Sequence, residues 1–217
     1  MKLISVNVGG PRAVDWHGRP VQTSIWKDPV EGRVPLRRLN LEGDQQSDLS
    51  VHGGPHKAVY LYPVEHYARW ARELPEIEFP LGAFGENFTT EGLLEDDVAI
   101  GDRFKVGTAE LVVTQPRMPC FKLGIRFGRD DMVKRFLRSG RSGYYVAVVR
   151  EGVVGRGDAI ERLSRDSRGV SIADVFALYS RDAGNRALLE RVVDHPGLPE
   201  SWRESFRQRL RALDAGK

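Results

Sequence analysis

The chain has 217 residues, enough for one large domain or for one domain with a small appendage. Apolar residues make up 41% and charged residues 29% of it, a balance that excludes wholesale disorder. No apolar run approaches the roughly 20 residues that span a bilayer, and the net charge of +3 is spread without a basic stripe. We therefore expect neither a membrane nor a nucleic-acid polymer as a partner.

The N-terminal segment has one lysine and no apolar core before a cleavage site, so it predicts a first strand and a cytoplasmic protein. Short β-branched and aromatic runs, separated by Gly, Pro, Asn or Asp, continue through the first 160 residues. The predicted strands are Leu3–Val8, Val21–Trp26, Ala58–Tyr62, Val98–Val106, Glu110–Thr114 and Tyr144–Arg150. Many short strands of this kind are typical of a barrel or a sandwich.

Two helices are predicted among these strands. The first follows Pro63, which suits an initial helical turn. Its apolar face is formed by Tyr67, Trp70, Ala71 and Leu74. The second begins at Asp130 or Asp131 and ends at Gly140. Its apolar face is formed by Met132, Val133, Phe136 and Leu137.

The pattern changes after about residue 165, where a polar linker is followed by three apolar stripes at helical spacing. Ser171 is a good N-cap for the first of these helices, and His195-Pro196-Gly197 ends the second. The stripes comprise Ile172, Val175, Phe176 and Tyr179; Leu188, Leu189, Val192 and Val193; and Trp202, Phe206, Leu210 and Leu213. We predict a mainly β domain with a few helices over residues 1–163 and a small three-helix subdomain over residues 164–217.

Cys120 is the sole cysteine, which excludes an intrachain disulfide, and also an Fe–S cluster or a Cys-rich zinc site built by this chain alone. It lies in TQPRMPCFKLGIR (residues 114–126), where two prolines predict a rigid loop after a strand. Arg117 and Lys122 would stabilise a thiolate, a nucleophile and soft-metal ligand, and Arg117 offers a fork for a phosphate. The alternative, which the residues alone favour, is a buried and inert cysteine.

A glycine-rich polar segment, residues 43–57, leads into the strand after Lys57. Gly53 and Gly54 would let backbone N–H groups approach an anion, and Lys57 would add a charge for a phosphate. An ordinary turn before a strand is an equally good interpretation. His52 and His56 also invite a zinc site, but the Gly-Gly-Pro between them disfavours the helix that would align two ligands.

A second polar segment, GAFGENFTT (residues 82–90), offers an amide, hydroxyls and a carboxylate through Asn87, Thr89, Thr90 and Glu86. This set suits the edge of a pterin ring, which presents alternating donors and acceptors. The alternative is a polar loop in which Asn87 is a cap.

Together these three segments resemble the MOSC family, named for the C-terminal domain of molybdenum cofactor sulfurase. The matches are GDQQSDLSVHGGPHKAVYLYP, FGENFTTEGL, IGDRFKVG and TQPRMPCFKLG, which occur in the family's order. The three-helix tail is similar to the YiiM-type branch, which is associated with resistance to hydroxylaminopurines. The resemblance implies a β-barrel-like fold that binds the molybdenum cofactor (Mo-molybdopterin).

The resemblance also implies roles for single residues. Cys120 matches the cysteine taken to coordinate molybdenum, and Arg117, Asn87 and Thr89 match positions expected to contact the pterin or its phosphate. Lys57 and Glu86 match the motifs as well and are predicted to bind the cofactor. The larger mitochondrial relatives carry an extra N-terminal β domain that this sequence lacks, so these loops, the C-terminal helices or a second subunit of a homodimer would supply the cofactor contacts.

The predicted activity is the reduction of small N-hydroxylated compounds to amines at molybdenum. His52 is the predicted proton donor, because an imidazole titrates near neutral pH. No Fe–S or flavin motif is visible, so a separate reductase must supply electrons. Two alternatives stay open: a persulfide carrier that uses Cys120, and a cofactor-binding module without turnover.

Overall fold

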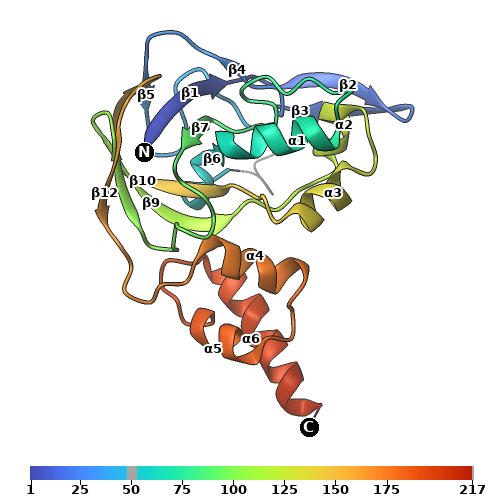
Figure 1. The fold of residues 1–217 in the computed structure, drawn as a ribbon, viewed down its shortest axis with the longest axis vertical. Coiled ribbons are helices and arrows are strands. Elements are labelled where there is room, and N and C mark those ends of the chain that lie inside the picture. Colours follow the sequence, from blue (N-terminus) through green and yellow to red (C-terminus); the bar gives the residue numbers. More distant parts are fainter. Residues whose placement is uncertain (48–52, 217) are drawn as a thin grey trace.

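A computed structural model describes residues 1–47 and 53–216. Figure 1 shows a strand-rich body with a helical unit beneath it. The strands of the described part are β1 (Lys2–Val8), β2 (Arg12–Trp16), β3 (Arg19–Thr23), β4 (Asp28–Pro29), β5 (Arg33–Leu36), β6 (Val59–Pro63), β7 (Phe88–Glu91), β8 (Arg103–Val106), β9 (Ala109–Pro116), β10 (Tyr144–Arg150), β11 (Gly152–Gly155) and β12 (Ile160–Ser164).

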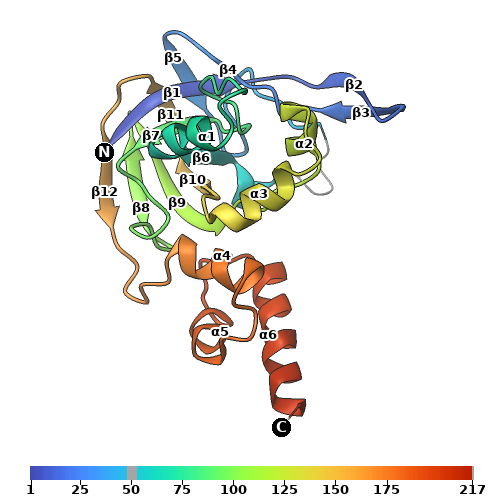
Figure 2. The same ribbon diagram turned by 45° about the vertical axis from the view of Figure 1, so that its right-hand side comes forward.

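Eight of these strands form one sheet in the order β12-β8-β9-β10-β6-β7-β1-β4. Its neighbours pair antiparallel except for β6 and β7, which are parallel. The sheet curls until the chain beside its first strand, β12, meets β1, the strand next to β4: Lys2 of β1 bridges to Ala159, just before β12, and the Leu3 N–H donates to the Asp158 carbonyl over 2.9 Å. Both ribbon views show β12 beside the N-terminus (Figures 1 and 2). This closure confirms the predicted mainly β, barrel-like core.

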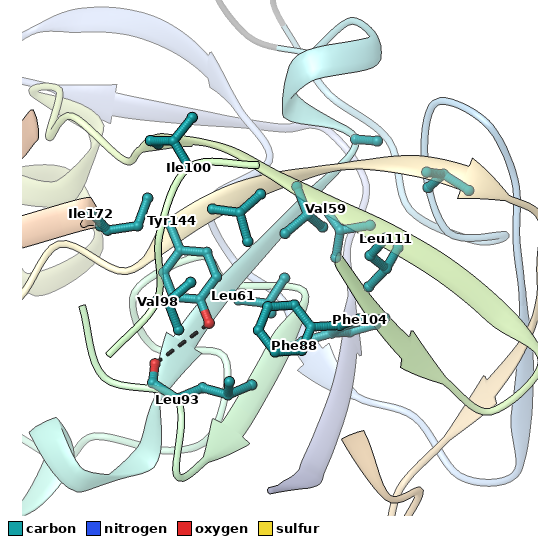
Figure 3. Packing of buried hydrophobic residues seen from close by; sticks show 14 of the residues in the cluster. Val59, Leu61, Phe88, Leu93, Val98, Ile100, Phe104, Leu111, Tyr144 and Ile172 are labelled. Carbon is teal, nitrogen blue, oxygen red and sulfur yellow. Dashed lines mark hydrogen bonds between the residues drawn. The ribbon is translucent and has the colours of Figure 1, made fainter. Parts of the chain in front are cut away.

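Alternate side chains of each strand point into the barrel, because successive residues of a strand face opposite sides of the sheet. In β10 the side chains of Tyr144, Val146 and Val148 are buried, whereas their neighbours face outward. Figure 3 shows Tyr144 among the core side chains, with its hydroxyl donating to the Leu93 carbonyl over 3.4 Å. The tyrosine is therefore buried with its polar atom satisfied, as a closed core requires.

The predicted strand at Val98–Val106 is wrong in its first half, because β8 begins only at Arg103. Gly101 has a φ of +88°, a conformation that breaks an extended run, and Asp102 follows it in a tight turn. Val98 and Ile100 are nevertheless fully buried, because this turn caps the open end of the barrel with apolar side chains. The apolar residues at Val98 and Ile100 thus indicate burial within a turn and not a strand.

Short helices cover the other side of the strand-rich body. They are η1 (Pro55–Lys57), η2 (Val64–His66), α1 (Tyr67–Glu73), α2 (Lys122–Phe127) and α3 (Met132–Ser139). Helix α1 buries Tyr67 and Trp70, but Ala71 is exposed, which corrects the predicted apolar face. Helix α3 follows Asp131 and ends at Gly140, whose φ of +70° suits glycine. No helix of the described residues is both long and apolar enough to cross a membrane.

Aromatic rings fill the space between these helices and the sheet. Trp70 of α1 donates its indole N–H to the Tyr62 hydroxyl over 2.7 Å, and the rings of Phe84 and Tyr62 stack with centroids 4.5 Å apart. Phe136 of α3 stacks on Trp70. This second core joins α1, α3 and the loop before β7, which forms part of the site described below.

The three C-terminal helices are α4 (Ile172–Ser180), α5 (Arg186–Val192) and α6 (Glu200–Ala215), as the stripes predict. Figure 2 shows α4 against the barrel and α6 leading away to the C-terminus. Ile172 packs in the barrel's own apolar cluster, and its N–H donates to the Val98 carbonyl over 2.9 Å. The subdomain is therefore anchored to the capping turn. β12 ends at Ser164, and the boundary between residues 163 and 164 remains a prediction.

Ser171→Ala is expected to lower the free energy of unfolding by about 1 kcal/mol, because Ser171 and Asp174 form a reciprocal capping box at the start of α4. Urea unfolding followed by circular dichroism measures the change. Ser167→Ala, in the exposed linker, is the matched control. An unchanged midpoint for Ser171→Ala would show that tertiary packing alone holds α4.

Candidate functional site

A cavity enclosing about 680 Å³, part of it open to solvent, lies where the loops at one end of the sheet meet α2. All three polar segments singled out in the sequence contribute to its wall. Its lining comprises Thr23, Ser24, Ile25, Lys27, Asp44, Gln45, Gln46, Ser47, Gly53, Lys57, Tyr60, Phe84, Gly85, Asn87, Arg117, Met118, Cys120, Lys122 and Tyr145.

Cys120 lies half-buried on this wall, between the end of β9 and the start of α2. Its carbonyl accepts the Leu123 N–H over 2.9 Å, so the chain turns into a helix immediately after it. The prediction of a rigid loop through residue 126 is therefore wrong beyond Phe121. Gly124, inside α2, lets the backbone of Arg129 approach the helix closely, because a Cβ there would lie 2.8 Å from the Arg129 carbonyl oxygen. A cysteine in an accessible cavity also disfavours the inert-core alternative.

Arg117 is buried behind Cys120, with 5% of its surface exposed. Its guanidinium lies 5.0 Å from the centre of the Phe136 ring and 5.6 Å from that of Tyr60, so aromatic faces hold it in place. Its Nη1 finds no hydrogen-bond acceptor among residues 1–47 and 53–216. Leaving a buried guanidinium donor without an acceptor costs free energy. Such a donor is expected in a site where an anionic ligand supplies the acceptor.

Asn87 ties three parts of the wall together. Its side-chain oxygen accepts the Tyr60 N–H over 3.1 Å, and its amide nitrogen donates to Asp44 Oδ2 over 2.9 Å. Its backbone carbonyl accepts the Asn7 N–H over 2.7 Å. The side chain lines the cavity, yet its amide is already engaged, so its first effect is to orient Asp44.

Lys27 and Asp44 form a buried ion pair on the same wall, with 8% and 3% of their surfaces exposed. The Gly9 N–H donates to Asp44 Oδ1 over 2.9 Å and fixes the carboxylate further. Burial lowers the pKa of Lys27, and the attraction of Asp44 opposes that shift without cancelling it. Neither residue was a candidate from the sequence, because Lys27 belongs to no motif and Asp44 carried no signal beyond its place in the glycine-rich segment.

Glu86 and Thr89 do not line the cavity; both are fully buried beneath it. The Glu86 carboxylate accepts the N–H groups of Gly82 and Phe84 over 3.0 Å each, the Thr89 hydroxyl over 2.8 Å and the Tyr67 hydroxyl. Burial raises the pKa of Glu86 although these donors act in the opposite direction. Glu86 and Thr89 thus shape the loop that presents Phe84, Gly85 and Asn87 to the cavity.

Lys57 lines the cavity at the end of η1, and its burial lowers its pKa. His52 lies outside the described residues, so its predicted role stays a prediction. The His56 carbonyl accepts the Thr114 hydroxyl over 2.6 Å, and its side chain does not line the cavity. Among residues 1–47 and 53–216, no three His, Cys, Asp or Glu side chains gather to hold a metal ion.

The cavity therefore combines a cationic set with flat apolar surfaces. Lys27, Lys57, Arg117 and Lys122 supply positive charge, whereas Asp44 is the one carboxylate among the residues found to line it. The aromatic side chains are Tyr60, Phe84 and Tyr145. Such a wall suits a flat, anionic ligand, and Cys120 offers it one soft donor atom.

Two protein-family models match different parts of the chain. The MOSC domain model matches residues 48–161, and the YiiM-like, 3-alpha helix domain matches residues 170–212. The Bacillus subtilis protein YflK is 43% identical over 206 residues, covering 94% of this chain and 92% of that protein. A Gibberella moniliformis protein named Reductase is 35% identical over 198 residues, covering 90% of this chain but 35% of the fungal protein.

Two solved structures of YiiM proteins share the fold over nearly the whole chain. The crystal structure of YiiM from Geobacillus stearothermophilus superposes with a TM-score of 0.81 at 36% identity, covering 96% of this chain and 98% of that one. YiiM from Escherichia coli superposes with a TM-score of 0.77 at 32% identity, covering 100% and 94%. With the domain match, the near-complete relatives and the shared fold, the chain belongs to the MOSC family and carries the three-helix extension of its YiiM-like members.

Proposed function

We propose that this protein is a molybdenum-cofactor-dependent reductase that converts small N-hydroxylated compounds, such as hydroxylaminopurines, to amines. The observation that carries the proposal is that Cys120 and Arg117 line one wall of a cationic, aromatic cavity, where Arg117 Nη1 has no hydrogen-bond acceptor among the described residues. The fungal relative named Reductase supports a redox role. Membership of the MOSC family supports the molybdenum cofactor.

The residues present fit such a cofactor. Cys120 would be the protein's thiolate ligand to the metal, since a thiolate is the soft donor available on this wall. Arg117 and Lys57 would bind the phosphate, and Tyr60 and Phe84 offer faces for the pterin ring. When bound, the cofactor supplies two-electron redox chemistry at molybdenum.

The reduction consumes two electrons and two protons per N–O bond and yields an amine and water. A separate electron-transfer protein supplies the electrons. The chain's own residues hold the substrate in the cavity, exclude bulk water with Ile25, Phe84 and Met118, and deliver a proton to the departing oxygen. The protein's residues thus bind and orient the substrate and supply a proton, whereas the cofactor would carry out the electron transfer.

The test is metal analysis followed by turnover. The full chain, produced in a host that makes the cofactor, is expected to hold close to one molybdenum per chain. With reduced methyl viologen as donor, it should convert 6-N-hydroxylaminopurine to adenine, measured by chromatography. Bound molybdenum without amine formation would indicate a cofactor-binding module instead. A labile extra sulfur on Cys120 without metal would indicate a persulfide carrier.

Arg117→Lys is expected to release molybdenum about tenfold faster during dialysis, because lysine keeps the charge but loses the planar fork that grips a phosphate. Arg156→Lys, on an exposed turn, is the matched control. Elemental analysis at intervals gives the rate of loss. Equal rates in both variants would exclude a cofactor contact by Arg117.

A further inference from the structure

The ion pair of Lys27 and Asp44 is costly where it lies. Both charges are almost fully removed from water, and a buried pair of this kind seldom stabilises a fold more than apolar side chains of the same size would. Its position on the cavity wall, among the residues that would contact a ligand, points to a use in function.

The hydrogen bonds of Asp44 fix its carboxylate in one orientation toward the Lys27 ammonium group. Its Oδ1 accepts the Gly9 N–H over 2.9 Å as well as the Lys27 ammonium, and its Oδ2 accepts the Asn87 amide over 2.9 Å. Asp44 is thereby fixed from two sides and faces Lys27 in one orientation. Within residues 1–47 and 53–216, the hydrogen bond found for the Lys27 ammonium is the one to Asp44, which leaves N–H groups for a ligand in the cavity.

We infer that Lys27 is the catalytic proton donor of this cavity and that Asp44 and Asn87 position its ammonium group; the inference rests on the proposed function. The N–O bond of the substrate breaks with two electrons from the external donor. One proton from Lys27 goes to the departing oxygen, which leaves as water. The second proton reaches the amine nitrogen from solvent, and solvent reprotonates Lys27.

The electrostatics support a donor at this position. Burial lowers the pKa of Lys27 below 10.5, while Asp44 and Glu86 are the carboxylates that raise it again. A lowered pKa makes the ammonium a stronger acid, and the attraction of Asp44 opposes its deprotonation. Arg117 cannot take this role, because a guanidinium does not release its proton in proteins.

The first test compares Lys27→Arg with Lys105→Ala, an exposed residue of β8. Arginine preserves the ion pair with Asp44 but does not release a proton, so Lys27→Arg should keep its melting temperature and molybdenum while its turnover falls about 100-fold or more. Lys105→Ala should match the wild type. A Lys27→Arg variant with wild-type turnover would overturn the inference.

The pH profile and chemical rescue separate proton donation from structure. Wild-type turnover should fall as the pH rises through the pKa of Lys27, and Asp44→Asn should move that fall to lower pH because it removes the carboxylate that raises the pKa. Lys27→Ala should regain turnover with added methylammonium. The rival donor is His52: loss of turnover in His52→Ala with rescue by imidazole, and no rescue of Lys27→Ala, would overturn the inference.

A measurement without turnover checks that the Lys27 amine faces the cavity. Cyanate carbamylates unprotonated amines, so Lys27 in the native chain should react at a rate that rises with pH, with the exposed Lys105 as the reference site. Peptide mass spectrometry reads both sites at once. A Lys27 that reacts only after unfolding would overturn the inference. Wild-type protein that holds molybdenum but forms no amine would overturn the proposed function, whereas turnover that survives in Lys27→Arg overturns the proton donor alone.

Discussion

Cys120→Ser is expected to leave the fold intact and to reduce bound molybdenum to background. A serine hydroxyl is a hard, protonated ligand that replaces a thiolate poorly at molybdenum. Within the described residues no cluster of His, Cys, Asp or Glu offers a substitute, so the loss should be complete. Turnover of N-hydroxylated substrates should disappear with the metal. Elemental analysis of the wild type and the variant from the same host measures the effect.

The fold is the control for this prediction. Cys120 lies half-buried at the cavity and outside both apolar clusters, so Cys120→Ser should unfold at nearly the wild-type urea concentration. Lys122→Ser, two residues along the same wall, tests whether any loss of local charge has the same effect. Full molybdenum in Cys120→Ser would show that the cofactor is held by its pterin and phosphate alone.

Glu86→Ala is expected to lower the free energy of unfolding by about 3 kcal/mol, because it leaves buried donors without an acceptor. These donors are the N–H groups of Gly82 and Phe84 and the hydroxyls of Tyr67 and Thr89. The loop that carries Asn87 should loosen, so cofactor retention should fall as well. Urea unfolding at pH 7 measures the change, and Glu91→Ala, exposed on β7, is the control.

The pH dependence of the free energy of unfolding tests whether the Glu86 carboxylate causes this stabilisation. Because the pKa of Glu86 in the fold is raised above 4.5, the folded state holds its proton longer than the unfolded state. The part of its stabilisation that is linked to protonation is therefore fully present below pH 4.5 and is lost as the pH rises through the folded pKa, whereas the hydrogen bonds that Glu86 accepts remain. Glu86→Gln cannot titrate, so the stability difference between wild type and Glu86→Gln should be most favourable to the wild type in acid. A pH-independent difference would contradict the raised pKa.

The sequence pattern predicted secondary structure correctly where the buried residues recur with the period of the strand or helix itself. The strand at Tyr144–Arg150 was predicted with its observed bounds, because alternate residues face the core. The cap at Ser171 was predicted because a serine before an apolar stripe at helical spacing is a good N-cap, and the structure adds Asp174 as its capping-box partner. Local pattern predicted a strand wrongly at Val98 and Ile100, because these apolar residues are buried without regular structure. It also missed the short helix α2, which follows a proline-rich segment.

The candidate site was predictable in part. Four residues from three separate segments, Lys57, Asn87, Arg117 and Cys120, lie on one cavity wall, which their shared family motif led us to expect. The same motif contains Glu86 and Thr89, whose side chains turn inward and hold the loop. A motif records which residues matter together, but it does not separate those that contact a ligand from those that support them.

The sequence by itself determined the mainly β core, the three-helix extension and the single thiol, because alternation, capping and cysteine count act over short distances. Only the tertiary structure decided which polar residues face the cavity, since that depends on how loops far apart in the chain meet. It alone paired Lys27 with Asp44, across 17 positions in the chain, and left Arg117 Nη1 without an acceptor among the described residues. Such features arise from burial and desolvation, which no local pattern of residues records.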